Sequence, residues 1–175
     1  THTSPVQVRT MLNNPLPIKI IVPWRVFRYE QEDARHTSNF YQLEWLVVWK
    51  GVTFWDLKWT LDTVMKKLLW DDTKLRFRPS IFPFTEPSAE IDIYWGLKTE
   101  TDYRITKGTG WLEIGGCGMV DPNVLKNCDI NPDEYNGFAF GMGIERIAML
   151  LYQIGDIRMF YENDVRFLEQ FKSSI

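Results

Sequence analysis

Residues 137–151, GFAFGMGIERIAMLL, constrain the fold most, because they predict a short strand, a glycine-rich turn and a helix in succession. Phe138 and Phe140 alternate with Ala139 as in a strand, so Ala139 faces away from the two rings. The glycines carry no Cβ and let a ligand approach the backbone closely. Arg146 falls in the first helical turn, where free N–H groups favour an anion. The stretch therefore predicts an anion-binding corner, although a corner with a surface arginine fits equally.

Four strings carry a resemblance to a known family. GFAFGMGIERIAML resembles motif 3 of class II aminoacyl-tRNA synthetases, and RVFRYEQEDARHTSNFYQLE, residues 25–44, resembles motif 2. With FPFTEPSAEIDIYW and LEIGGCGMVDPNVL, they resemble the alpha chains of bacterial phenylalanyl-tRNA synthetases from Thr1 to about Phe171. The resemblance implies one catalytic core domain over residues 1–175, with motifs 2 and 3 present and motif 1 and the N-terminal coiled coil absent.

Composition bounds the class of protein. At 175 residues the chain is long enough for one domain with a sizeable core. Its net charge of −3 and pI of about 5.4 lack the basic footprint of a self-sufficient nucleic-acid binder. Two cysteines make no disulfide framework, and no membrane span or signal peptide is visible, so we expect a cytoplasmic protein. A metal site is conceivable but lacks ligand-type spacing; its members would be Cys117, Cys128, His2 and His36.

The period-two pattern predicts a long hairpin formed by residues 18–30 and 40–49, joined by the polar residues 31–39. One face of the second strand is apolar and should pack on helices. The other face of the hairpin carries Arg28, Glu30, Gln42 and Glu44. A solvated face would explain these charges, but their aromatic and apolar neighbours favour an orienting site within a pocket.

The remaining pattern completes an α+β fold, an antiparallel sheet with helices packed mainly on one face. Ser4 and Pro5 open a first helix, with Ser4 as a candidate cap, and residues 53–70 form an amphipathic helix capped by Thr53 and Asp56. Further predicted elements are strands over 74–80, 88–95 and 111–120, a surface hairpin over 96–110, a short helix within 121–135 and a final helix over about 160–171.

The resemblance assigns candidate site residues. The positions matching the phenylalanine site are His2, Ser4, Gln42, Glu44, Phe82, Phe84 and Ala139. Those matching the ATP site are Arg28, Glu30, His36, Phe40 and Arg146, and Glu86 is the candidate Mg²⁺ ligand. Without the resemblance, Phe82 and Phe84 would be assigned to core packing and Ser4 to a helix cap alone.

The implied reaction is attack of the phenylalanine carboxylate on the α-phosphorus of ATP, followed by transfer of the phenylalanyl group to tRNA(Phe). Alignment and charge stabilisation carry the first step. In the family, a beta chain completes a heterotetramer of two alpha and two beta chains. The alternatives are an altered copy that binds phenylalanine or ATP without catalysis, and a class II ligase for another aromatic acid.

The sequence departs from the family pattern at several positions. Tryptophan stands at positions 24, 45 and 59, where the family usually has small or polar residues, and indoles there can overpack a closely spaced sheet. Gly115 occupies a position where a larger apolar residue is expected.

Overall fold

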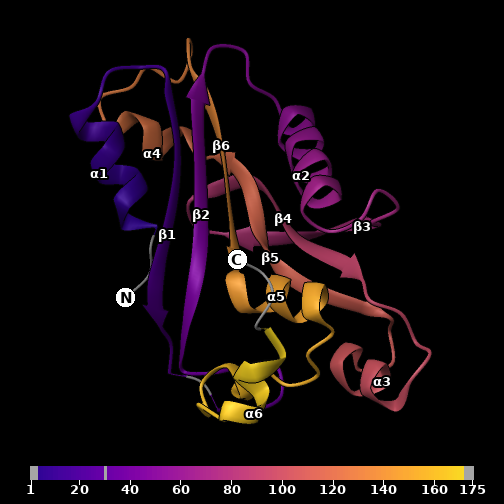
Figure 1. Ribbon diagram of the computed structural model, residues 1–175. Helices are drawn as coiled ribbons and strands as arrows, with labels where there is room; N and C mark the ends of the chain where they lie inside the picture. The colour runs from indigo at the N-terminus through magenta and orange to yellow at the C-terminus, as the bar shows by residue number, and fades with distance from the viewer. Residues whose placement is uncertain (1–3, 30, 172–175) are drawn as a thin grey trace.

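In the computed structural model, which describes residues 4–29 and 31–171, six antiparallel strands form one sheet in the order β1-β2-β6-β5-β4-β3 (Figure 1). The predicted α+β architecture, an antiparallel sheet flanked by helices, is confirmed. The strands are β1 (Ile18–Phe27), β2 (Asn39–Trp49), β3 (Leu75–Phe82), β4 (Thr85–Tyr94), β5 (Trp111–Val120) and β6 (Asn136–Gly143). The helices are α1 (Pro5–Asn13), α2 (Phe54–Leu68), α3 (Glu100–Thr106), α4 (Pro122–Lys126), α5 (Ile144–Tyr152) and α6 (Val165–Leu168), with 3₁₀ turns η1 (Ile157–Phe160) and η2 (Glu169–Phe171).

The predicted hairpin forms from β1 and β2, in a register that pairs Ile18 with Val48 and Phe27 with Asn39. Pro23 does not interrupt β1, which continues from Ile18 to Phe27. Pro23 lies opposite Leu43 on a strand that pairs on one side only. A proline without an N–H is tolerated on such an edge strand. The hairpin therefore pairs without a break from Ile18 to Phe27.

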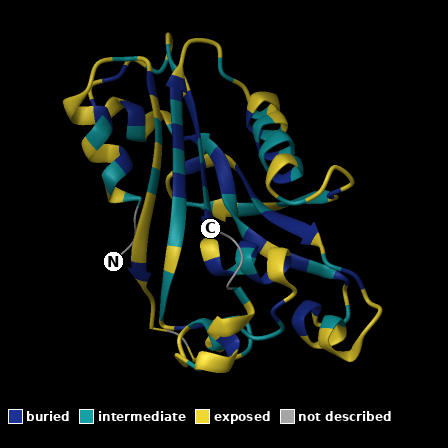
Figure 2. Cartoon of the chain, in the orientation of Figure 1, coloured by how far each residue is buried: buried dark blue, intermediate teal, exposed yellow. Residues whose placement is uncertain are grey.

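Helices pack on both faces of the sheet, and the inner strands β4, β5 and β6 are more deeply buried than the edge strand β1 (Figure 2). Leu43, Trp45 and Val47 of β2 pack into the core cluster that includes α2 and α5. The alternate residues Leu46 and Val48 join a second cluster with α1 and α4. The period-two pattern of β2 is thus correct, but the expectation of helices mainly on one face missed the layer of α1 and α4.

The ends of the first two helices differ in how they are capped. Thr53 and Asp56 form the predicted capping box of α2, in which each side chain bonds to the other residue's backbone N–H. Ser4 precedes α1 with helical dihedral angles and makes no side-chain cap, so the predicted cap is wrong. Pro5 does occupy the first helical position. The Ser4 hydroxyl lies instead 3.5 Å from Glu44 Oε1.

Two predictions for the second half of the chain are wrong. Residues 96–110 contain α3 rather than a hairpin, because Thr99 and Asp102 form a capping box that starts a helix. The final helix is also broken into η1, α6 and η2. Asp156 and Asp164 each accept a backbone N–H two residues later and start separate short helices.

Gly115 lies where β4 and β5 form a β-bulge, between the pairs Ile91–Gly115 and Asp92–Glu113. A Cβ at this position would lie 1.9 Å from the backbone oxygen of Gly141 on the neighbouring strand β6. The expectation of a larger apolar residue is therefore wrong. The close approach of β5 and β6 requires glycine here.

Candidate active site

A cleft of about 980 Å³ opens on the face of the sheet that α1 covers in part. Its walls come from α1, the β1–β2 hairpin, the β3–β4 turn, strands β5 and β6, and the start of α5. The predicted site residues that line it are Ser4, Arg28, His36, Phe40, Gln42, Glu44, Phe82, Phe84, Ala139 and Arg146. His2 and Glu30 lie outside the described residues. Glu86 is exposed on β4 and does not line the cleft.

A buried carboxylate forms one end of the cleft. Glu44 is only 5% exposed, and the Gln7 side-chain amide donates a 2.7 Å hydrogen bond to its Oε2. Burial raises the pKa of Glu44 to about 7, against the opposing effects of hydrogen bonds from Ser4 and Gln7. A cationic group that entered the cleft here would stabilise the ionised form. This end is therefore suited to hold an ammonium group.

Strand β6 makes room for these polar side chains. Gly141 pairs with Glu44, and a Cβ on Gly141 would lie 2.8 Å from Glu44 Oε1 and 2.7 Å from Gln42 Nε2. Any larger residue would displace both side chains from their positions. The glycine of the motif 3 string thus supports the acidic end of the cleft.

Gln7 is a site residue that the sequence analysis did not identify. It lies three residues after Ser4 on α1, so both side chains lie on one face of the helix. That spacing was the available signal, but only the fold places the helix face beside β2. Gln7 and Ser4 together orient Glu44.

Two phenylalanines lie next to the acidic end. The rings of Phe82 and Phe84 are nearly parallel, with centroids 6.1 Å apart and planes inclined by 8°. Gly116 on β5 lies under Phe82, where an added Cβ would approach the ring to 2.9 Å. Phe84 is half exposed, at the turn between β3 and β4. Such rings can contact an aromatic ligand by stacked or edge-to-face packing.

Arginines form the other end of the cleft. The Arg28 guanidinium lies 5.1 Å from the centroid of the Phe40 ring, a cation–π distance. Arg146 Nη1 donates a 2.7 Å hydrogen bond to the backbone oxygen of Glu113 and lies 3.6 Å from its Oε1. The two arginines come from the hairpin and from the first turn of α5, respectively. This end is suited to a polyanion.

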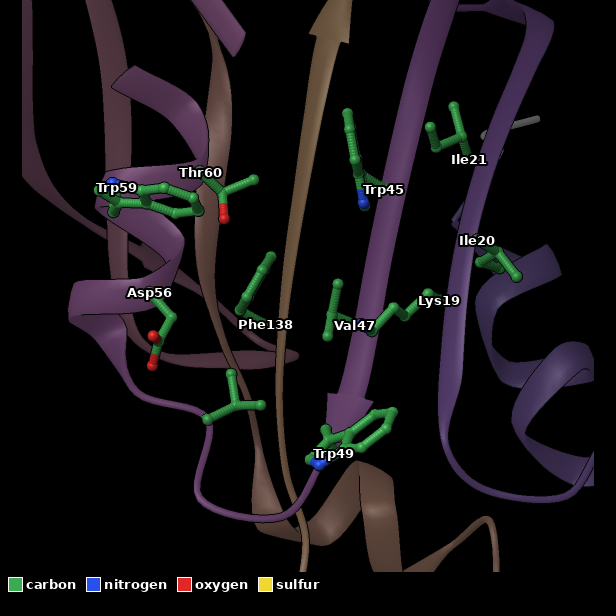
Figure 3. Close-up of a pocket in the computed structure, with 11 residues that line it drawn as sticks. Lys19, Ile20, Ile21, Trp45, Val47, Trp49, Asp56, Trp59, Thr60 and Phe138 are labelled. Carbon is green, nitrogen blue, oxygen red and sulfur yellow. The ribbon is translucent and has the colours of Figure 1, made fainter. Parts of the chain in front are cut away.

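A second hollow of about 510 Å³ lies between α2 and the β1–β2 hairpin (Figure 3). It is lined mainly by apolar side chains, among them Trp45, Val47, Trp49, Trp59 and Phe138. Trp45 packs on the Phe140 ring with centroids 5.0 Å apart, so its indole fills space instead of crowding the sheet.

The other two unusual tryptophans also avoid the overpacking that their size suggested. Trp24 and Trp59 are 68% and 64% exposed, respectively. Side chains exposed to this extent are not packed between the strands, so they do not crowd the sheet. The expected conflict between indole size and sheet geometry is therefore wrong at positions 24 and 59.

The fold, the cleft and the comparison with known families together identify the class of protein. Residues 1–171 match the family described as the tRNA synthetases class II core domain (F), and the chain belongs to this family. Among curated relatives, the phenylalanine–tRNA ligase alpha subunits of Flavobacterium johnsoniae and Flavobacterium psychrophilum are 74% and 71% identical over all 175 residues. The chain spans about half the length of these relatives, 51% in each case.

A solved structure supports the fold. The pyrrolysyl-tRNA synthetase of Desulfitobacterium hafniense superposes with a TM-score of 0.59 at 15% sequence identity. The match covers 91% of this chain and 50% of the other. Within residues 4–29 and 31–171, no helix combines the length and the apolar character needed to cross a bilayer.

Proposed function

We propose that this chain is the catalytic core of a phenylalanine–tRNA ligase alpha subunit, which activates phenylalanine with ATP and transfers it to tRNA(Phe). One observation carries the proposal: a single cleft joins a buried acid, two phenylalanine rings and two arginines. An amino acid with an aromatic side chain and a triphosphate match these three parts in chemistry. The similarity to alpha subunits of known ligases favours phenylalanine as that amino acid.

In this proposal the acidic end binds the substrate's ammonium group. Glu44 and Gln42 hold it, Ser4 and Gln7 orient Glu44, and Phe82 and Phe84 contact the ring. Ala139 walls the far side of the ring pocket. His2 matches the family position beside Ser4 and is assigned by sequence similarity alone.

The arginine end binds ATP. Arg28 contacts the α-phosphate, and Arg146 stacks on the adenine near the γ-phosphate, with Phe40, His36 and Glu30 completing the nucleotide site. The phenylalanine carboxylate oxygen forms a bond to the α-phosphorus, and the bond to pyrophosphate breaks. The arginines stabilise the charge that builds up on the phosphate oxygens.

Magnesium is expected to accompany ATP. Among the described residues no group of three or more carboxylate, histidine or cysteine side chains could hold a metal. That fits an ion that is bound through the phosphates and only one or two protein carboxylates. Glu86 remains the candidate ligand by sequence similarity, while its exposed place outside the cleft gives it no support.

The expected partners are tRNA(Phe) and the beta chain, in a cytoplasmic heterotetramer of two alpha and two beta chains. Pyrophosphate–ATP exchange that depends on phenylalanine tests the proposed activity in the full-length protein, with and without the beta chain. Exchange that responds to phenylalanine above background is the expected result. Binding of phenylalanine and ATP without exchange would favour the non-catalytic alternative, and a panel of aromatic acids distinguishes a ligase of other specificity.

A further inference from the structure

Glu145, the neighbour of Arg146 in the first turn of α5, is a buried acid to which the proposed reaction assigns no role. It is 6% exposed and lines the cleft. Its Oε1 accepts a 2.8 Å hydrogen bond from the backbone N–H of Tyr41 and a second from the hydroxyl of Tyr161. Among the described residues, Oε2 has no hydrogen-bond partner. The carboxylate therefore depends on these two donors.

The Tyr41 N–H lies at a gap in the sheet. Pairing between β2 and β6 begins at Gln42, opposite Gly143, so Phe40 and Tyr41 extend beyond the last residue of β6. The Glu145 carboxylate takes the place of the missing strand as hydrogen-bond acceptor. Without it, a backbone N–H near the cleft would lose its partner, which is costly in a partly buried position.

Tyr161 donates to the same oxygen of the carboxylate as the Tyr41 N–H. Burial, with the hydrogen bond to Glu145, raises the pKa of the Tyr161 hydroxyl, so it stays protonated and acts as the donor. The same C-terminal segment holds the connection between β1 and β2, because Ile157 N–H donates a 3.0 Å hydrogen bond to the backbone oxygen of Ala34. The C-terminal segment thus contacts the tip of the hairpin directly through Ile157 and contacts the start of β2 indirectly through Glu145.

We propose that Glu145 and Tyr161 are positioning residues that hold the start of β2, which pairs with β1 but not with β6, and with it Phe40 and Arg28, in place for ATP. The proposal rests on the function proposed above. We call the contacts of Glu145 with Tyr41 and Tyr161 the brace. The amino-acid subsite should be nearly independent of this brace. Gln42 and Glu44 are held by pairing with β6, whereas Phe40 and Tyr41 are not. The brace therefore acts on nucleotide binding and alignment.

The test compares Tyr161→Phe with wild type in phenylalanine-dependent pyrophosphate–ATP exchange by the assembled enzyme that carries this chain. This change removes one hydroxyl and keeps the ring. We expect the KM for ATP to rise about ten-fold, while the KM for phenylalanine changes less than two-fold. Tyr152→Phe is the matched control, because Tyr152 is 53% exposed at the end of α5. It should leave both constants unchanged.

The outcomes separate this inference from the proposed function. If wild type shows no phenylalanine-dependent exchange, the proposed function fails. If wild type is active and Tyr161→Phe raises both KM values equally, or neither, the brace is overturned. Should Tyr161→Phe unfold, as judged by circular dichroism, Glu145→Gln is tested instead. The change in its KM for ATP is then compared with the change in its KM for phenylalanine. A rise confined to ATP supports the proposal.

Discussion

The side-chain amide of Gln7 lies 2.7 Å from Glu44 Oε2, across 37 positions of sequence. This contact joins α1 to β2 and leaves Glu44 Oε1 directed toward Ser4. Both hydrogen-bond donors to this buried carboxylate are neutral, and burial raises its pKa despite the opposing charge of Arg28. A positively charged ligand in the cleft would therefore stabilise the ionised form further.

The first prediction concerns pH. Because the Glu44 pKa is raised from 4.5 to about 7, the carboxylate ionises between those values only at a cost to the folded state. The KM for phenylalanine should fall as the pH rises from 6 to 8, since the ammonium group binds the ionised form. In Glu44→Gln this dependence should disappear. A wild-type KM that does not change over this range would argue against Glu44 as the ammonium anchor.

The same shift predicts an effect on stability. Ionisation of the buried Glu44 destabilises the folded state as the pH rises through the folded-state pKa of about 7. We therefore compare the thermal stability of Glu44→Gln with that of wild type at two pH values. The stability of the variant relative to wild type should be greater at pH 8 than at pH 5. The same difference in stability between variant and wild type at pH 5 and pH 8 would contradict the raised pKa of Glu44.

Arg28→Ala and Arg146→Ala should each lower the exchange rate by roughly 10²–10³-fold while the fold remains intact. Loss of one electrostatic contact to the reacting phosphates has a cost of about this size. Exchange kinetics and circular dichroism measure the two effects. Arg166→Ala is a suitable control, because the Arg166 side chain is 90% exposed and pairs with Asp164 away from the cleft. Near-wild-type rates would remove either arginine from the site.

Ala139→Gly should admit para-chlorophenylalanine. Ala139 lines the cleft, and under the proposed function its methyl group excludes a substituent at the para position. Relief of such a clash is worth roughly 1–3 kcal/mol, or about a 10- to 200-fold shift in preference. Tyrosine should gain less, because its hydroxyl would enter an apolar corner without a partner. An unchanged ratio of the two amino acids in the exchange assay would place Ala139 outside the ring pocket.

Gly115→Ala should destabilise the fold by about 1–3 kcal/mol or more, since its Cβ would lie 1.9 Å from the backbone oxygen of Gly141. Chemical denaturation measures the change. Gly143→Ala serves as the control, because the nearest atom to an added Cβ there is Arg146 Cγ at 4.0 Å. Equal stability of the two variants would show that the β5–β6 contact tolerates a side chain.

Local sequence signals explain which elements could be predicted. The alternation in β2 and the capping pair of α2 are set by neighbouring residues, and both are confirmed. The capping box of α3 obeys the same chemistry, but the glycine- and threonine-rich composition around it suggested a surface hairpin. The breaks in the last helix arise from Asp156 and Asp164, whose side chains cap two separate short helices.

The rest of the site could not be found from local patterns. Gln7 meets Glu44 only because α1 folds over β2, and Tyr41 meets Glu145 across 104 positions. The need for glycine at position 115 likewise comes from the close approach of another strand. These are contacts between distant segments, and no periodicity of one segment specifies them.

The hydrogen bond from Ile157 to Ala34 has a consequence for how the protein is made. During translation, the β1–β2 hairpin leaves the ribosome long before β6, α5 and η1, which later support its tip. Closure of such long loops is slow, and unpaired strand edges stay accessible in the interval. The apolar residues Ile21, Trp24 and Phe27 of the edge strand β1 stay exposed even in the folded structure, so this edge carries apolar surface before and after the hairpin tip is supported.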